Sequence, residues 1–305
     1  MLSVYKYTFF LKFLTPATFP VYKGSVLRGA VIANFKNIVC INKKEKNCNS
    51  CFASESCVYK KIFEPVDKSN IPLPFILEPP YDKKKEYKKG ERFEFNLLLI
   101  GKTSVYFPYF VIAVKRMENI GIGMKSRGKF ILEKIKNSKR VIYTCRDEKL
   151  LEFLQPARIK RGKITDTLTL NFISPARIKI GGKLINNLPF SLLMKILFRR
   201  TSTLKKYYED TNQDNIKWQE ILKDAFFIKT ISSNLKWYDW ARYSLRQKTL
   251  MKLGGFVGKI TYQGNFKKFL PFIKLGEISI TAIYKKKRDE PVDEMIALIL
   301  AFLAP

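Results

Sequence analysis

The sequence predicts an α+β fold made of two tandem ferredoxin-like domains. Each domain has the fold that is also found in RRM domains. Stretches with strand composition alternate with amphipathic helical stretches, in an order that suits an antiparallel sheet covered by helices on one face. A similar order recurs in the second half, and 305 residues with 46% hydrophobic content can fill two cores. We therefore expect an N-terminal domain over residues 1–150, a C-terminal domain over residues 151–284 and a basic and apolar tail over residues 285–305.

The first half predicts the order strand, helix, strand, helix, strand, strand. Residues 1–14 have the Tyr, Phe, Leu and Val content of a strand, and residues 24–35 place apolar side chains at helical spacing with Ser25 as the N-cap. The later elements are a strand at 92–101, a helix at 106–121 and strands at 129–135 and 139–145. A cysteine-rich insertion, residues 40–57, interrupts this order. The connection after the insertion contains prolines and a basic run, which is either a solvated loop or a contact for a polyanion.

The second half predicts a similar series after a boundary near residues 147–165. The expected strands are residues 167–180, 240–252, 255–263 and 276–284. The expected helices are residues 188–208 and 266–273.

The charge of the chain indicates a polyanionic partner. Lys and Arg number 57 against 26 Asp and Glu, which gives a formal net charge of +31. A membrane partner would need an apolar span or a basic amphipathic helix, and neither is evident: Lys6 and Lys12 interrupt the apolar N-terminus, and the apolar C-terminal run of eleven residues is too short to cross a bilayer. We expect a cytoplasmic protein that binds nucleic acid and no membrane.

Glycine-rich, basic turns are suited to binding phosphates, because glycine lets a phosphodiester approach main-chain N–H groups. The stretch GIGMKSRGKF, residues 121–130, is either a plain turn or such a site, and GGFVG, residues 254–258, is either a bulged strand or a turn at an RNA-facing edge. We expect GGFVG at a basic surface, with the nearby rings of Trp237, Trp240, Tyr243 and Tyr262 available to stack bases. The candidate RNA-binding residues are Arg127, Lys129, Arg158, Arg177, Arg199, Arg200, Arg242, Arg246, Lys248, Gly254 and Gly255.

Four of the five cysteines lie close together in the insertion. Cys40, Cys48, Cys51 and Cys57 have the spacing C-x7-C-x2-C-x5-C, which supplies the four sulfur ligands of tetrahedral zinc. The alternatives are a structural zinc site and a set of reduced, partly buried thiols. A catalytic zinc is not expected, because four cysteines would close the coordination sphere and the chain contains no histidine.

Several segments together resemble one family, the CRISPR-associated endoribonucleases of the RAMP superfamily, which process precursor CRISPR RNA. The matching segments, in order, are VLRGAVIANF, CVYKKIFEP, YFVIAVKRMENIGIGMKSRGKFILEKI, FISPARIKIGGKL, FRRTSTL and WARYSLRQKTLMKLGGFVGKITYQGNFKKFLPFIKLGE. The resemblance spans about residues 1–280. It implies tandem ferredoxin-like domains, binding of CRISPR repeat RNA, metal-independent cleavage and association with a CRISPR effector complex.

The sequence departs from this family in two places. After LGE, the family usually continues with a glycine-rich loop, whereas here ISITAIYKKKRDEPVDEMIALILAFLAP contains no glycine. Many relatives also place a histidine near the first helix as general acid or base, and this chain has none.

The resemblance implies an active site near the first helix, with no cofactor for catalysis. Cleavage by the substrate's own 2′-OH needs in-line positioning, stabilisation of phosphorane charge and proton transfer. We expect Arg28 to stabilise the charge, Lys36 or Lys23 to act as acid or base, and Tyr22 to orient the 2′-OH. Lys and Tyr have reference pKa values of about 10, which predicts a slow enzyme.

Two other functions remain open from the sequence. The chain can hold repeat RNA without cleaving it, delivering or protecting CRISPR RNA for an effector complex, which the missing histidine and altered C-terminal loop favour. It can also bind polyanions without specificity, in which case repeat and scrambled RNA bind equally well at high salt.

Overall fold

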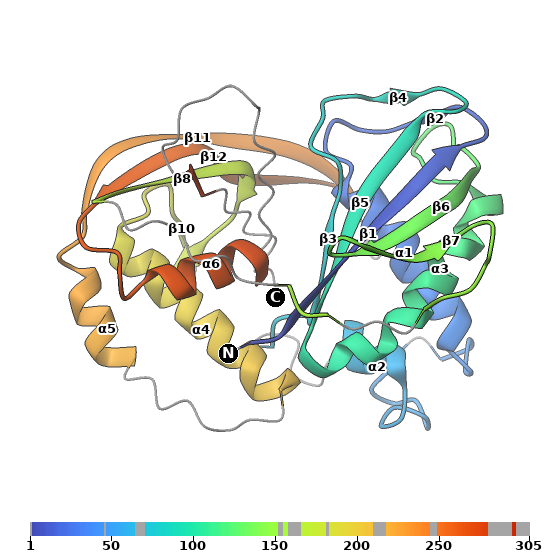
Figure 1. The fold of residues 1–305 in the computed structure, drawn as a ribbon, viewed down its shortest axis with the longest axis horizontal. Coiled ribbons are helices and arrows are strands. Elements are labelled where there is room, and N and C mark those ends of the chain that lie inside the picture. Colours follow the sequence, from blue (N-terminus) through green and yellow to red (C-terminus); the bar gives the residue numbers. More distant parts are fainter. Residues whose placement is uncertain are drawn as a thin grey trace. The chain divides into compact units, whose positions relative to one another are not determined.

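A computed structural model describes residues 2–45, 47–64, 71–151, 155–157, 166–180, 183–209, 218–244, 249–279 and 295–296. The chain folds as two compact units, one of Met1–Ala157 with Tyr207–Asp210 and the other of Arg158–Lys206 with Thr211–Pro305. Each unit has its own hydrophobic core. Figure 1 shows the helices and strands of both units.

The N-terminal unit contains a five-stranded antiparallel sheet in the order β3-β5-β1-β6-β7. Its strands are β1 (Val4–Phe13), β3 (Phe75–Glu78), β5 (Arg92–Ile100), β6 (Phe130–Asn137) and β7 (Arg140–Thr144). The helices α1 (Gly24–Val39) and α3 (Phe107–Ile120) contribute their buried residues to the same core (Figure 1). The chain order β1-α1-β3-β5-α3-β6 is the ferredoxin-like order, and β7 adds a fifth strand at the edge.

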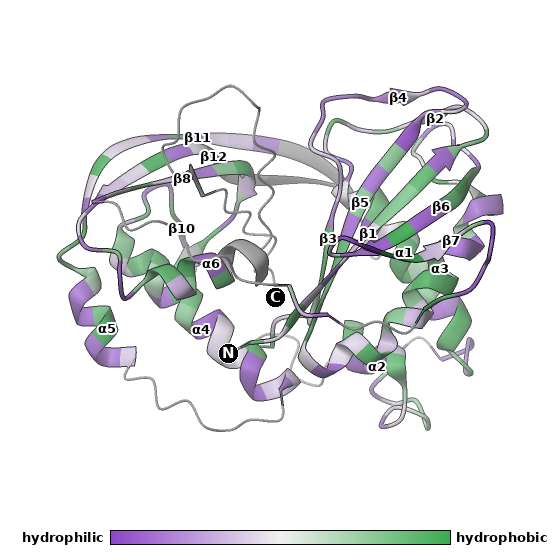
Figure 2. Ribbon diagram, in the orientation of Figure 1, coloured by the Kyte–Doolittle hydropathy of each residue, from purple (hydrophilic) through white to green (hydrophobic). Residues whose placement is uncertain are grey.

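Buried and more exposed residues alternate along β1, and this alternation determines which face of the sheet is buried. Tyr7, Phe9, Leu11 and Phe13 are buried, whereas the residues between them are half-buried or exposed. Tyr7 and Phe9 pack against Phe107 of α3, with ring centroids 3.7 and 6.2 Å apart. One face of the sheet is therefore covered by helices and the other is more polar. Figure 2 shows the same division along the strands.

The smaller elements of this unit join the main ones. They are β2 (Ala17–Thr18), which pairs with β4 (Glu86–Tyr87), the short helix α2 (Val58–Phe63) and the 3-10 helix η1 (Gly101–Tyr106). The prediction missed β3, because its four residues lie inside the proline-containing connection.

The C-terminal unit has a sheet in the order β11-β12-β8-β13, with a strand-and-helix order that also fits the ferredoxin-like fold. Its strands are β8 (Thr167–Ala176), β11 (Lys229–Ser244), β12 (Thr249–Gln263) and β13 (Met295–Ile296), with the short pair β9 (Lys179–Ile180) and β10 (Lys183–Leu184). Its helices are α4 (Phe190–Tyr208), α5 (Trp218–Ala225) and α6 (Leu270–Ser279). The predicted tandem ferredoxin-like class is confirmed, although β13 runs parallel to β8.

Two predicted strands of this unit are wrong. Residues 240–252 do not form one strand, because Trp240–Ser244 ends β11 and Thr249–Lys252 begins β12, in a long antiparallel pair. Residues 276–279 belong to α6, and 280–284 lie outside the described residues. The helix continues because Gly276 lets it pack closely on α4: a Cβ at Gly276 would lie 2.6 Å from a methyl carbon of Leu197. The strand β13 lies in the predicted tail.

No helix in the described part of the chain combines the length and the apolar character needed to cross a bilayer.

Candidate functional site

Lys23 does not lie where a general acid or base should lie. Its side chain is fully buried at the N-cap of α1, and its Nζ donates to the carboxylate and the main-chain oxygen of Asp82, both at 2.8 Å. Asp82 also accepts a hydrogen bond from the Tyr87 hydroxyl. The predicted catalytic role of Lys23 is therefore corrected to a structural one, because a buried ammonium held by a carboxylate anchors the segment that covers the start of the helix.

The other three catalytic candidates are spread along α1. Tyr22 precedes the helix, and the space left by Gly24 admits its ring: a Cβ there would lie 2.6 Å from the Tyr22 hydroxyl oxygen. The Arg28 guanidinium lies 4.7 Å from the centre of the Phe75 ring, and the Lys36 ammonium lies 5.0 Å from that of Tyr59. With a rise of about 1.5 Å per residue, Arg28 and Lys36 are about 12 Å apart along the helix. They do not meet at one phosphate.

The GGFVG stretch does not lie at a basic surface. Gly254, Gly255 and Phe256 are buried in the middle of β12, so the expectation that the two glycines form a turn and contact RNA is wrong. A Cβ at Gly255 would lie 2.8 Å from the main-chain oxygen of Ala176, so this glycine is needed for the close approach of β8. The bulge expected at Gly258 is confirmed, because its φ is +119° and the register with β8 shifts there.

Arg177 is held against this buried stretch. Its Nη1 donates to the main-chain oxygen of Gly254 at 2.9 Å. On the paired strand β11, the Trp237 indole lies close to Gly254 and donates to the Asp239 carboxylate at 2.9 Å. Tyr262, one of the rings expected to stack bases, is instead buried, and its hydroxyl donates to the Leu188 oxygen at 2.7 Å.

The sequence prediction missed most of β11, which is the exposed edge strand of this sheet. Trp237 is 42% exposed and Tyr238 is 43% exposed, with the exposed cation Lys236 beside them. Rings that stack bases next to cations that hold phosphates are typical of single-strand RNA binding. The sequence of residues 229–239 could have predicted this strand, because its polar and aromatic side chains suit a strand with two solvated faces.

The remaining predicted contacts fall in three places. Arg127 and Lys129 are exposed in the loop between α3 and β6, and on α4 Arg199 is exposed and Arg200 is half-buried. Arg242 lies near the end of β11. Arg158, Arg246 and Lys248 lie outside the described residues.

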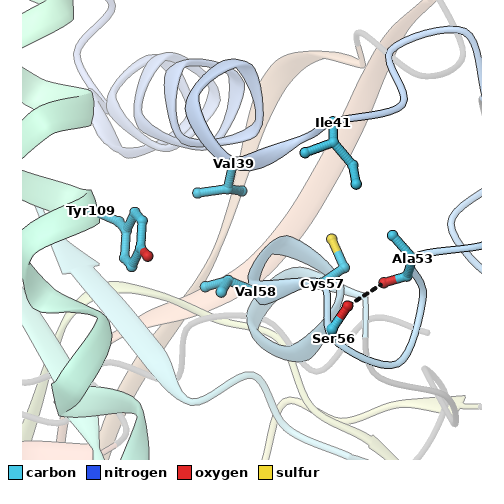
Figure 3. Close-up of a pocket in the computed structure, with 7 residues that line it drawn as sticks. All are labelled: Val39, Ile41, Ala53, Ser56, Cys57, Val58 and Tyr109. Carbon is cyan, nitrogen blue, oxygen red and sulfur yellow. Dashed lines mark hydrogen bonds between the residues drawn. The ribbon is translucent and has the colours of Figure 1, made fainter.

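The four insertion cysteines are thiols in the structure. Cys48 is buried, and burial raises the pKa of its thiol, with the Glu64 carboxylate acting in the same direction. Cys57 lines a mainly apolar hollow of about 220 Å³ (Figure 3). The other lining residues are Val39 of α1, Val58 of α2, Tyr109 of α3, and Ile41, Ala53 and Ser56 of the insertion. Among the described residues, no three Cys, Asp or Glu side chains are grouped as metal ligands. The zinc site stays a prediction, which metal analysis of the purified protein tests.

Family comparisons agree with this architecture. Residues 170–281 match the family model described as CRISPR-associated endoribonuclease Cas6, and residues 2–153 match a second model described as an N-terminal domain. No curated protein matches the chain.

Solved Cas6 structures share the fold across both units. The Cas6 (TTHB231) product complex has 14% sequence identity and a TM-score of 0.51, covering 91% of this chain and 93% of that chain. TTHB231 is a Cas6 of Thermus thermophilus. A chain of the partial Cas6-RT-Cas1--Cas2 complex has 13% identity and a TM-score of 0.53, covering 90% of this chain and 42% of that chain. The match of residues 170–281 to the Cas6 model agrees with the resemblance seen in the sequence, and the solved structures share the fold of this chain.

Proposed function

We propose that this protein binds CRISPR repeat RNA and processes precursor CRISPR RNA. The match of residues 170–281 to the Cas6 endoribonuclease model carries this proposal. The formal charge of +31 and the exposed rings of β11 support it, because an RNA strand offers phosphates to cations and bases to aromatic faces.

The reaction that fits this chain is attack of the substrate's 2′-OH on the adjacent phosphate. It breaks the bond to the 5′ oxygen of the next nucleotide and leaves a 2′,3′-cyclic phosphate and a 5′-OH. No metal is needed, because the nucleophile is already attached to the substrate and the protein supplies position and charge. Arg28 is the residue we assign to the phosphorane, because its guanidinium stays protonated at neutral pH.

The geometry of α1 refines the other assignments. The burial of Lys23 and its ion pair with Asp82 argue against a role in proton transfer, and Lys36 is about a dozen ångströms from Arg28 along the helix. We assign Tyr22, which precedes the helix, to the 2′-OH, and Lys36 to another phosphate of the same strand. With a reference pKa of about 10, Tyr22 is a weak general base at neutral pH, and the expected cleavage is slow.

Single-turnover cleavage of repeat RNA in EDTA tests this proposal. A matched RNA with one 2′-deoxynucleotide at the cleavage position should bind normally and stay intact. Arg28→Ala should lower the rate about 10²-fold or more. Arg116→Ala removes an exposed arginine of α3 and should leave the rate unchanged. Cleavage of the deoxy substrate would overturn the 2′-OH mechanism.

The second candidate function is RNA binding without cleavage, for delivery of CRISPR RNA to an effector complex. The specific observation in its favour is that α1 spreads the predicted catalytic residues instead of collecting them. Stable, repeat-specific binding with no cyclic-phosphate product would support it. Equal affinity for repeat and scrambled RNA at high salt would instead indicate nonspecific polyanion binding.

A further inference from the structure

One end of the N-terminal unit carries a concentration of exposed cations outside α1. The segments 82–91 and 124–129 contain eight cations and three acids. We call the eight cations the basic platform: Lys83, Lys84, Lys85, Lys88, Lys89, Lys125, Arg127 and Lys129. All eight are exposed.

Residues 13–19 hold the two segments side by side. On one side, Phe19 donates its main-chain N–H to Lys85 at 2.6 Å, and Gly90 donates to Phe13 at 2.7 Å. On the other side, Thr18 donates to Ser126 at 3.0 Å, and Leu14 donates to Lys129 at 2.7 Å. The two basic segments therefore lie on either side of residues 13–19, at the end of the sheet that bears β2 and β4 (Figure 1).

The platform is built on rigid supports. Tyr87 lies in the sequence between Lys83–Lys85 and Lys88–Lys89, and its side chain is buried. Its ring centroid lies 5.3 Å from that of Phe13 and 5.5 Å from that of Phe19. A Cβ at Gly128 would lie 2.6 Å from the Ala17 methyl carbon, so this glycine allows the second segment to approach β2 closely. The main chain that carries these cations is therefore held in place before a ligand binds.

The three acids of these segments leave most of the positive charge in place. Asp82 is paired with the buried Lys23, and Glu91 is paired with Lys84 at 2.7 Å. The third acid, Glu86, is exposed and offsets at most one further positive charge. The other seven cations of the platform form no ion pair with any residue that the structure describes. In the loop, the N–H groups of Lys125 and Arg127 likewise donate to no described residue, so they remain available to an anion.

We infer that the basic platform is a second RNA-binding surface, which holds the phosphates of a single strand without reading its sequence. Its composition favours this partner, because it offers cations and main-chain donors but few rings to stack bases. A membrane is less suitable, because Met124 is the one large apolar side chain exposed in the two described segments. The inference rests on the proposed RNA binding only for the choice of partner.

The test compares charge-removing pairs from the two halves of the platform. The variants are Lys88→Ala/Lys89→Ala and Lys125→Ala/Arg127→Ala. The control is Lys102→Ala/Lys139→Ala, two exposed lysines at the opposite end of the sheet, next to the ends of β5 and β6. Binding of repeat RNA and of scrambled RNA is measured as a function of salt concentration, alongside binding to anionic phospholipid vesicles.

Each platform pair should reduce the slope of log affinity against log salt by about 1.4 for both RNAs, and the quadruple variant by about 2.8. The control pair should not change the slope. An unchanged slope in either platform pair overturns the inference, as does a loss confined to repeat RNA or to vesicles. Failure of the proposed function is separate, because it appears as wild-type protein with no preference for repeat RNA. In that case, the salt dependence of binding to scrambled RNA still tests whether the platform binds phosphates.

Discussion

The two glycine-rich, basic stretches of this chain look alike in sequence and differ in structure. Residues 121–129 form a loop in which residues 124–127 and Lys129 are exposed, and its cations belong to the basic platform. Residues 252–264 mostly continue the strand β12, and Gly254, Gly255 and Phe256 are buried there between β8 and β11. Glycine allows close packing in both stretches, at Gly128 beside Ala17 and at Gly255 beside Ala176, but only Gly255 lies within a strand that is paired on both sides. The same composition therefore indicates a surface in one domain and a core in the other.

The largest expected effect comes from filling the glycine positions of β12. Gly258→Ala combines a φ of +119° with a Cβ 2.1 Å from the Asn234 oxygen and should lower the free energy of unfolding by about 3 kcal/mol. Gly255→Ala places a Cβ against the main-chain oxygen of Ala176 but has no unfavourable φ, so it should lower the free energy of unfolding by about 2 kcal/mol. Urea denaturation measures both.

The control for these variants is Gly90→Ala, which has a φ of +88° and open space around the new Cβ. It should cost about 1 kcal/mol, from backbone conformation alone. If Gly255→Ala costs no more than Gly90→Ala, the close approach of β8 does not require this glycine.

The variant Arg177→Ala tests whether this arginine stabilises the fold or contacts RNA. Removal of its hydrogen bond to the Gly254 oxygen should lower the free energy of unfolding by about 1.5 kcal/mol. The conservative Arg177→Lys variant should recover part of that loss if the bond matters. If Arg177→Ala leaves the unfolding curve unchanged and weakens RNA binding, Arg177 contacts RNA, as the sequence predicted.

Tyr262→Phe removes a buried hydrogen bond at the end of β12 and should cost about 1 kcal/mol at pH 7. Burial raises the pKa of Tyr262 far above its ordinary value, because the phenolate is disfavoured in the core. The wild-type residue therefore contributes its full stability below the unfolded-state pKa of about 10 and loses it as the pH rises beyond that. The difference between wild type and variant should shrink above pH 10, measured by urea denaturation across the pH range.

The smallest effect on folding is expected in the first stretch. Lys125→Ala/Arg127→Ala should change the free energy of unfolding by less than about 0.5 kcal/mol, because both side chains are exposed and form no ion pair with the described part of the chain. A thermal melt beside wild type checks this. A large loss of stability would show that these cations serve the fold, as Gly255 does.

Several features of the protein were determined by its sequence. Strand-like composition placed β1, strand-like and helix-like stretches placed β5, β6, α3 and α4, and the helical spacing of apolar residues placed α1. The excess of Lys and Arg indicated a polyanion. These signals are local or compositional, so they do not depend on which segments meet. The family resemblance rests on the same local stretches.

Tertiary structure decided the environment of individual residues. Lys23 has the sequence context of an exposed catalytic lysine, yet Asp82, far along the chain, buries and pairs it. The burial of Gly255 depends on the approach of β8, and the basic platform depends on residues 13–19 lying between two distant segments. Burial and pairing are set by contacts between residues that are remote in sequence, so they are fixed only when the chain folds.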